Sequence, residues 1–212
     1  MPSPPDSTTD DGDPPASAPA HQPAEPVTGT HPAACALRLA IRRASIPGVS
    51  RLGRLSLPRV FLEDFSGSGH LAKAVHALGY VVLCWDISMG ASYDLTNKCN
   101  RQLIQGWVLS GQVWGVHMGT PCSSFSRARR GKPPPLRDRL HIMGLPNLSD
   151  KDQVRVQIVN LLMRFSFKLL LTCRQQGIPA TIENPATSML WWTPQAQQAT
   201  RWGEFTSQTS EF

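Results

Sequence analysis

Short apolar runs that alternate with helix-like segments constrain the fold of this 212-residue chain more than any other feature. Four such runs predict strands, at residues 59–63, 80–85, 112–118 and 178–183. Three segments with helical features separate them, at residues 71–79, 98–109 and 150–176. Strands that alternate with helices predict an α/β domain in which helices cover a parallel sheet. We expect this domain to span residues 58–192.

The two ends of the chain differ from this pattern. Residues 1–30 are rich in proline and contain five acidic residues but no lysine or arginine, whereas residues 31–59 contain six arginines and no acid. Because proline-rich polar chain buries too little apolar surface to order itself, we expect a disordered tail over residues 1–57. The arginine-rich part, 38–59, is typical of a solvated linker, a phosphate-binding arm or an organelle-targeting helix. We expect a polar C-terminal tail over residues 193–212.

Cysteine usage and charge limit the environments that suit the chain. The five cysteines include no CxxC pair, which argues against a disulfide framework or a zinc ribbon and favours a reduced, intracellular protein. The most apolar stretch, 161–173, is interrupted by Arg164 and Lys168, so we expect no membrane span. The net charge of +6 favours an anionic partner. We expect a nuclear protein, with an organelle as the alternative suggested by segment 38–59.

Chemically active residue types follow the first two predicted strands. The first strand leads into the turn FSGSG at 65–69, where glycines let the backbone approach a ligand closely. The second strand ends at Asp86, whose carboxylate could accept two hydrogen bonds from a ribose diol. Asp94 is too near Asp86 for a helical crossover, so we place it on the same loop or on a very short strand. Ligands of parallel sheets bind beyond the carboxyl ends of the strands, which is where these residues fall.

The next two strands end in a cysteine and a glutamate. Cys122 follows Pro121 beside a basic stretch, so nearby arginines would favour its thiolate form. A buried structural cysteine is the alternative. The basic stretch, 127–139, contains six basic residues and one acid and is typical of a phosphate-binding loop or of a solvated one. The fourth strand leads into Glu183 and Asn184, which adds a carboxyl group at the same sheet edge.

Taken in order, FSGSG, Asp86, PCSSFS and ENP resemble the motifs of the C5-cytosine DNA methyltransferases, over residues 58–192. The resemblance implies a Rossmann-like methyltransferase fold with S-adenosylmethionine (S-adenosyl-L-methionine) as cofactor. By resemblance, Asp86 would hold the ribose, Ile87 would pack on the adenine and Asp94 would bind the adenine amino group. The other residues implied for the cofactor site are Phe65, Ser66, Gly67, Gly69 and Pro121.

The same resemblance implies DNA as the substrate, with Cys122 and Glu183 as the catalytic residues. The Cys122 thiolate would add to C6 of cytosine, and C5 would then accept the methyl group. Glu183, in a closed site, would meet the negative charge that develops at N3, and Asn184 would hold the loop. The target base must leave the duplex to be reached. The residues expected to contact DNA are Ser126, Arg127, Arg129, Arg130 and Lys132.

The chain also departs from the family's pattern. Family members continue well past the glutamate motif with a Gln-x-Arg-x-Arg strand and a target-recognition domain, whereas this sequence ends 29 residues after Glu183. Trp114 stands eight positions before Cys122, where family members usually have a polar residue. We expect an incomplete catalytic domain whose recognition domain a longer product or another chain would supply. Two alternatives stay open: an inactive relic that binds cofactor or nucleic acid, and a methyltransferase that modifies amino groups through Asn184 and Pro185.

Overall fold

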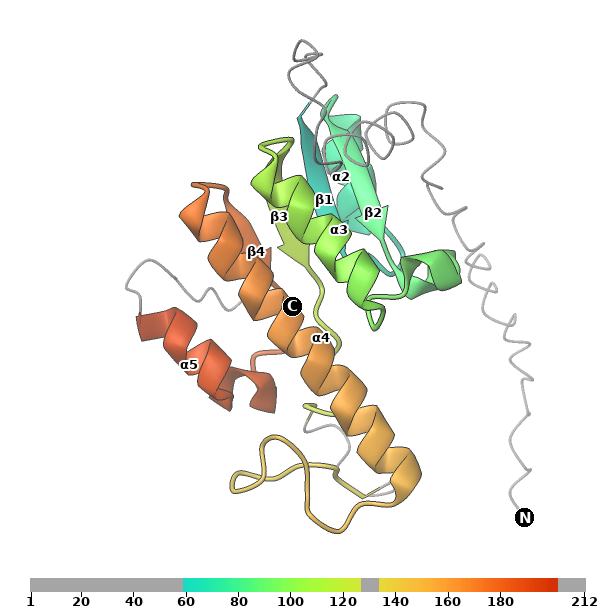
Figure 1. Ribbon diagram of the computed structural model, residues 1–212, viewed down its shortest axis with the longest axis vertical. Coiled ribbons are helices and arrows are strands. Elements are labelled where there is room, and N and C mark those ends of the chain that lie inside the picture. The colour runs from blue at the N-terminus through green and yellow to red at the C-terminus, as the bar shows by residue number, and fades with distance from the viewer. Residues whose placement is uncertain (1–58, 127–133, 202–212) are drawn as a thin grey trace, which may run out of the picture.

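The computed structural model describes residues 59–126 and 134–201. The predicted tail, residues 1–57, lies outside them. The described residues form a layered α/β domain, with helices on both faces of a four-stranded sheet (Figure 1). This confirms the α/β class, and the small parallel sheet is compatible with a Rossmann-like fold.

All four strands run parallel, in the order β2-β1-β3-β4. Their bounds are β1 Val60–Asp64, β2 Val81–Trp85, β3 Val113–Met118 and β4 Ala180–Ile182. The last strand is shorter than the predicted run because the N–H of Ile178 still donates to the carbonyl of Cys173 in the preceding helix. The sheet is therefore built from the four runs that the sequence predicts, each displaced by at most a few residues.

The helices divide between the two faces of the sheet. α2 (His70–Ala77) packs on β1 and β2, whereas α3 (Lys98–Leu109) and α4 (Asp150–Gln175) lie side by side on the opposite face (Figure 1). Right-handed crossovers require this division, because the chain moves one way from β1 to β2 and the other way from β2 through β3 to β4. The direction of winding therefore reverses between β1 and β3, the position where open α/β sheets bind ligands.

Helix α4 begins and ends close to where the sequence predicts. The hydroxyl of Ser149 accepts a hydrogen bond from the N–H of Asp152 at 3.3 Å, which caps the first turn. Gly177 follows the last turn with a φ of 66° and donates its N–H to the carbonyl of Arg174. Only glycine adopts this conformation without strain, so the end of the helix is encoded locally.

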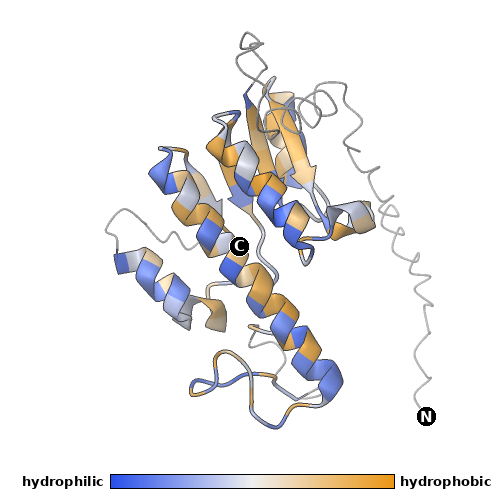
Figure 2. Cartoon of the chain, viewed as in Figure 1, coloured by the Kyte–Doolittle hydropathy of each residue, from blue (hydrophilic) through white to orange (hydrophobic). Residues whose placement is uncertain are grey.

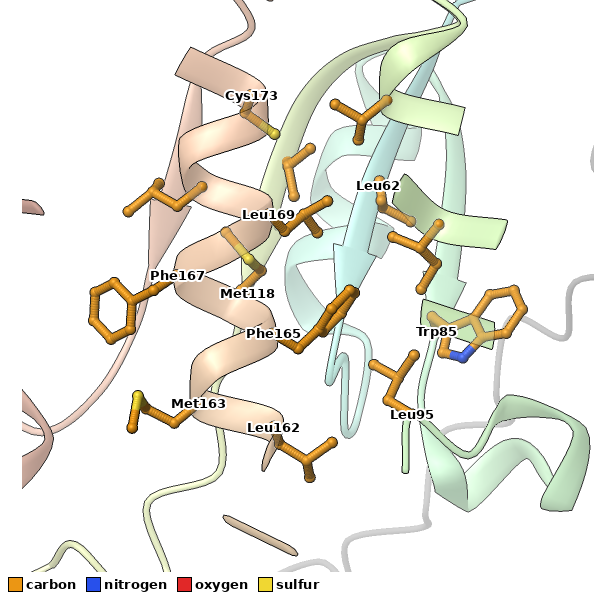
Figure 3. Packing of buried hydrophobic residues seen from close by; sticks show 14 of the residues in the cluster. Leu62, Trp85, Leu95, Met118, Leu162, Met163, Phe165, Phe167, Leu169 and Cys173 are labelled. Atoms are coloured by element: carbon orange, nitrogen blue, oxygen red, sulfur yellow. The ribbon is translucent and has the colours of Figure 1, made fainter. Parts of the chain in front are cut away.

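The hydrophobic core lies between α4 and the strands. Figure 3 shows Phe165 and Leu169 directed from α4 toward the strands near Leu62, while Met163 and Phe167 point to the other side of the helix. Figure 2 shows apolar strands beneath helices that carry hydrophilic outer surfaces. Although Arg164 and Lys168 interrupt its apolar stretch, α4 is long and apolar enough to cross a membrane, but 67% of that apolar window is buried inside the domain. In this fold it is the core helix.

The segment after residue 192 is a helix where we expected a polar tail. α5 (Pro194–Arg201) packs against α4, and its residues Ala196 and Ala199 are buried. Two alanines three positions apart lie on one helix face, and the glutamines around them gave the segment its polar composition. The predicted tail is thus wrong for residues 194–201, and residues 202–212 lie outside the described part of the chain.

Candidate functional site at the carboxyl edge of the sheet

The parallel strands bring four chemically active segments to one edge. The glycine turn follows β1, the Asp86 loop follows β2, the Cys122 loop follows β3 and Glu183 follows β4. Because every strand runs in the same direction, all four segments leave the sheet at its carboxyl edge, as the sequence predicts.

The turn after β1 is built from backbone conformations that favour glycine. Gly67 and Gly69 have φ values of 50° and 66°, and Phe65 also has a positive φ, 58°. The turn closes with a 2.8 Å hydrogen bond from the N–H of Gly69 to the carbonyl of Ser66. A Cβ added to either glycine would meet no atom within 4 Å, so the turn has open space beside it that a ligand can enter.

Asp86 is tied to this turn across the sheet edge. Its Oδ2 accepts the N–H of Gly67 at 3.0 Å, and its Oδ1 accepts the N–H of Ser88 at 2.8 Å. Partial burial acts to raise the pKa of Asp86, but the hydrogen bonds from Ser88 and Gly67 outweigh it and hold the pKa below its usual value. Ile87 is 59% exposed beside it. An ionised carboxylate and an exposed apolar side chain thus adjoin the open turn.

Asp94 lies on the loop after β2, one of the two positions predicted for it. The loop contains two short 3₁₀ helices, η1 (Ile87–Met89) and η2 (Ala91–Tyr93). Both carboxylate oxygens of Asp94 accept hydrogen bonds at 2.7 Å from Thr96, one from its N–H and one from its hydroxyl. These bonds fix the path of the chain into α3, so Asp94 has a structural role that the sequence did not indicate.

The Cys122 loop is a tight turn. The carbonyl of Cys122 accepts the N–H groups of Phe125 and Ser126 at 2.9 and 2.8 Å. Cys122 and Pro121 are half-buried, whereas Phe125 is fully buried and Ser124 almost so. The predicted DNA-contact residue Ser126 is half-buried in this turn, and the other four, Arg127, Arg129, Arg130 and Lys132, lie outside the described residues.

Arg137 anchors this loop from inside the protein. It is 1% exposed, and its guanidinium donates to the hydroxyl of Ser124 at 2.9 and 3.1 Å and to Oδ1 of Asn160 on α4 at 2.7 Å. It also donates to two backbone carbonyls and lies 3.8 Å from the centre of the Phe125 ring. Burial lowers the pKa of Arg137 to about 10, so it remains charged at neutral pH.

This corrects the prediction that the whole basic stretch 127–139 faces solvent or phosphate. Arg137 is a structural residue, and its partners lie inside the domain. One feature could have revealed it. Asn160 is a polar residue among the apolar positions of α4, and a buried amide needs a hydrogen-bond partner.

The loops after β3 and β4 lie side by side. The N–H of Glu183 donates to the carbonyl of Met118 at 2.9 Å, and the Asn184 side chain donates to the carbonyl of Thr120 at 2.6 Å. This bond gives Asn184 the loop-holding role that the resemblance implies. The Glu183 side chain is 75% exposed, so the described residues do not enclose it in the closed site that we expected.

His117 is the side chain at this edge that the sequence analysis missed. Its Nε2 lies 3.3 Å from Oε2 of Glu183, and its Nδ1 lies 2.8 Å from the hydroxyl of Thr181. Glu63 pairs with His117 in the strand register and is 4% exposed. Burial raises the pKa of Glu63, and the nearby carboxyls of Glu183 and Asp86 raise it further, whereas a hydrogen bond to the Ala72 backbone acts in the other direction.

The other described cysteines do not compete with Cys122 for a role at this edge. Burial raises the pKa of Cys84 to about 11 and that of Cys173 to about 12, and neighbouring carboxyls add to both shifts, so these two remain thiols at neutral pH. Cys99 is exposed but lies on α3. Cys122 is therefore the one of the four described cysteines placed to act as a nucleophile there.

Comparisons with protein-family models, curated proteins and solved structures gave no match to this chain. Within residues 59–126 and 134–201, no group of three or more histidine, cysteine, aspartate or glutamate side chains is arranged to hold a metal ion. Any function must therefore be argued from the geometry of the edge itself.

Proposed function

We propose that this chain transfers a methyl group from S-adenosylmethionine to C5 of cytosine in DNA, through a covalent adduct with Cys122. The observation that carries the proposal is the hydrogen bond from Asn184 to Thr120, which joins the loop of Cys122 to the loop of Glu183. A nucleophile and a carboxyl group 61 residues apart in the sequence thus follow neighbouring strands. The glycine turn leaves the sheet at the same edge.

The residues of the β1–β2 edge suit S-adenosylmethionine. The open turn formed by Phe65, Ser66, Gly67 and Gly69 offers space for a ligand, as the absence of atoms near an added Cβ indicates. The ionised Asp86 can accept hydrogen bonds from ribose hydroxyls, and the exposed Ile87 can pack on an adenine. We also retain Asp94 and Pro121 as predicted contacts. When bound, the cofactor supplies an electrophilic methyl group on a sulfonium.

Besides the cofactor, the chemistry assigned to Cys122 and Glu183 needs only a base, such as a water molecule, to take up the C5 proton. The Cys122 thiolate adds to C6, which makes C5 nucleophilic, while Glu183 donates a proton or hydrogen bond to N3. C5 would then take the methyl group that the bound cofactor supplies. Loss of the C5 proton to a base then expels the Cys122 thiolate, and N3 returns its proton.

His117 is positioned to orient Glu183 through a hydrogen bond. A neutral imidazole that accepts the Thr181 hydroxyl at Nδ1 carries its proton on Nε2, the atom that faces Glu183. A carboxyl group at this position would otherwise be free to rotate into solvent, because most of its surface is exposed. His117 is thus a positioning residue in the proposal.

The substrate in this proposal is cytosine in DNA. The target base must leave the duplex to reach Cys122, and the neighbouring phosphates must be held while it does so. The predicted phosphate contacts are Ser126, Arg127, Arg129, Arg130 and Lys132. A nuclear location belongs to the same proposal. A recognition domain in a longer product or another chain would select the target sequence.

Covalent trapping on a duplex that contains 5-fluorocytosine tests this function. Fluorine at C5 cannot leave as a proton would, so the Cys122 adduct should accumulate with S-adenosylmethionine and survive denaturing electrophoresis. Cys122→Ser should form no adduct. Cys99→Ser, which changes an exposed cysteine on α3, should trap like the wild type. If saturating cofactor yields no adduct with the wild-type chain, the chain is not such an enzyme.

The two alternatives give different results. An inactive relic would bind S-adenosylmethionine in a calorimeter but transfer no methyl group. An amino-group methyltransferase would give N-methylated rather than C5-methylated product. The amide of Asn184 already donates to Thr120, which favours a structural role for it over that of an acceptor-loop residue.

A further inference from the structure

A groove between α3 and α4 shares no residue with the site described above. Its volume is about 290 Å³. Each helix contributes one face to it, and four of its lining residues are basic: Lys98 and Arg101 from α3, and Arg164 and Lys168 from α4. α3 and α4 lie side by side in Figure 1, and Figure 2 shows hydrophilic residues on both. The groove is therefore a concave, basic surface made by two helices.

The positive charges in the groove are not neutralised by the described part of the chain. No acidic residue lines it, and none of the four cations forms an ion pair with an acid in residues 59–126 and 134–201. Arg164 and Lys168 are one helical turn apart, so their like charges repel. A bound anion would relieve this repulsion, and no acidic side chain among the described residues pairs with either cation.

Arg101 is already fixed in position for such an anion. One of its terminal nitrogens donates to the carbonyls of Leu95 and Thr96, both at 2.7 Å. These bonds hold the guanidinium while leaving its other N–H groups for a ligand. Gln102 and Gln105 add amide groups to the same helix face. Guanidinium and ammonium groups together, with no carboxylate, are the chemistry that recognises phosphate esters.

We propose that this groove binds phosphates of the DNA backbone, as a second contact surface beyond the catalytic edge. The choice of DNA as the polyanion rests on the proposed function. α3 begins at Lys98, after the loop that leaves the carboxyl end of β2, so the groove lies toward the edge at which the target cytosine would be held. A duplex bound at that edge can extend over α3 and α4, and its phosphates would then meet the four cations.

The test compares two double variants of the full chain that lose the same charge. Arg164→Gln with Lys168→Gln changes the groove, and Lys151→Gln with Arg201→Gln changes exposed cations elsewhere. Binding to a fluorescein-labelled duplex is measured by anisotropy over a range of salt concentrations. The groove variant should bind roughly tenfold more weakly at about 0.1 M salt, and its log–log salt slope should fall by about 2, because each lost phosphate contact removes about 0.9. The control should stay within about twofold of wild type.

Equal losses in the two variants would overturn the proposal, because they would reflect net charge alone. So would undiminished binding by the groove variant, or a groove that prefers inorganic triphosphate or a polyglutamate peptide to the duplex. Circular dichroism melts of both variants show that they fold. Covalent trapping is scored separately: groove-dependent binding without an adduct leaves this proposal standing and removes the proposed function, whereas an adduct without groove dependence does the reverse.

Discussion

The two halves of the sheet's carboxyl edge are held together in different ways. In the β1–β2 half, backbone N–H groups converge on one carboxylate: Gly67, at a φ of 50°, and Ser88 both donate to the side chain of Asp86. In the β3–β4 half, side chains make them. Arg137 joins the Cys122 loop to α4, and Asn184 joins the loops that follow β3 and β4.

This difference predicts how each half responds to mutation. The β1–β2 half depends on glycine conformations and on the Asp86 carboxylate, which accepts N–H groups that every non-proline residue provides, so most side-chain changes away from Asp86 should leave its shape intact. The β3–β4 half depends on a few buried polar side chains, whose loss leaves their partners unsatisfied. Four substitutions test the contrast, taken from the largest expected effect to the smallest.

Arg137→Met should cause the greatest loss of stability. It removes the hydrogen bonds to Ser124, Asn160 and two carbonyls, and the buried Ser124 hydroxyl and Asn160 Oδ1 lose this donor. We expect a loss of about 3–5 kcal/mol in the free energy of unfolding, because several hydrogen bonds to a charged donor are lost and more than one buried polar group is left unsatisfied, at about 1–3 kcal/mol each. Urea titration followed by circular dichroism measures it.

Arg139→Met is the matched control for this substitution. Arg139 is exposed and lies 5.0 Å from the ring of Trp192, so its loss should cost less than about 1 kcal/mol. If Arg137→Met leaves too little folded protein, Arg137→Lys retains the charge but loses the guanidinium geometry and should give an intermediate value. Equal effects at 137 and 139 would show that the β3–β4 half does not depend on the buried arginine.

Asp64→Asn tests a buried polar side chain within the β1–β2 half. Asp64 is fully buried, and neither carboxylate oxygen has a hydrogen-bond partner among the described residues. Burial raises the pKa of Asp64 well above its ordinary value of 3.8. Asparagine has nearly the same shape and cannot ionise, so we expect the variant to be more stable than wild type by roughly 1–3 kcal/mol at pH 7.

The pH dependence of the free energy of unfolding tests whether the ionisation of Asp64 causes this difference in stability. Between pH 3.8 and the raised folded-state pKa, the unfolded chain has released a proton that the folded chain still binds. Wild-type stability therefore falls as pH rises through this window, by up to about 1.4 kcal/mol per pH unit, and the variant escapes that fall. Urea titrations at several pH values should show the variant's advantage shrinking toward pH 4. A constant difference would mean that Asp64 ionises freely in the folded state.

The β1–β2 half of the edge was predictable from sequence, because the residues that form it are close together in the sequence. The FSGSG turn and Asp86 directly follow apolar runs, and their hydrogen bond spans 19 residues within one strand–helix–strand unit. The positions of Cys122 and Glu183 at strand ends also followed from local pattern. What those residues contact did not follow.

The contacts of the β3–β4 half were not predictable, because they join distant parts of the chain. Asn184 reaches a carbonyl 64 residues away, and His117 reaches a hydroxyl at the same separation. Arg137 looked like part of a solvated basic stretch because its burial depends on α4, which follows it. His117 and Asn160 each interrupt an apolar pattern, and that interruption is the one sequence feature that indicates a polar partner elsewhere in the chain.

Asn184→Ala should have a smaller effect than Arg137→Met, because it removes one hydrogen bond. The bond to Thr120 is 2.6 Å long, and its loss leaves a half-buried carbonyl unsatisfied. We expect a loss of roughly 1–2 kcal/mol in a urea titration. Thr187→Ala, at an exposed position on the same loop, should cost less than about 0.5 kcal/mol. No difference between the two variants would mean that the loops after β3 and β4 are held together by other contacts.

Gly67→Ala and Gly106→Ala form the smallest and most symmetrical test, since they place the same methyl group in two backbone conformations. Neither added Cβ would meet an atom within 4 Å, so packing does not distinguish them. At Gly67 the φ of 50° penalises alanine, and we expect a loss of about 1 kcal/mol. At Gly106, inside α3, alanine should gain roughly 0.5–1 kcal/mol, because it favours the helix. Opposite signs in thermal or urea melts would confirm that backbone conformation holds the β1–β2 half, whereas a stabilising Gly67→Ala would remove the basis for that distinction.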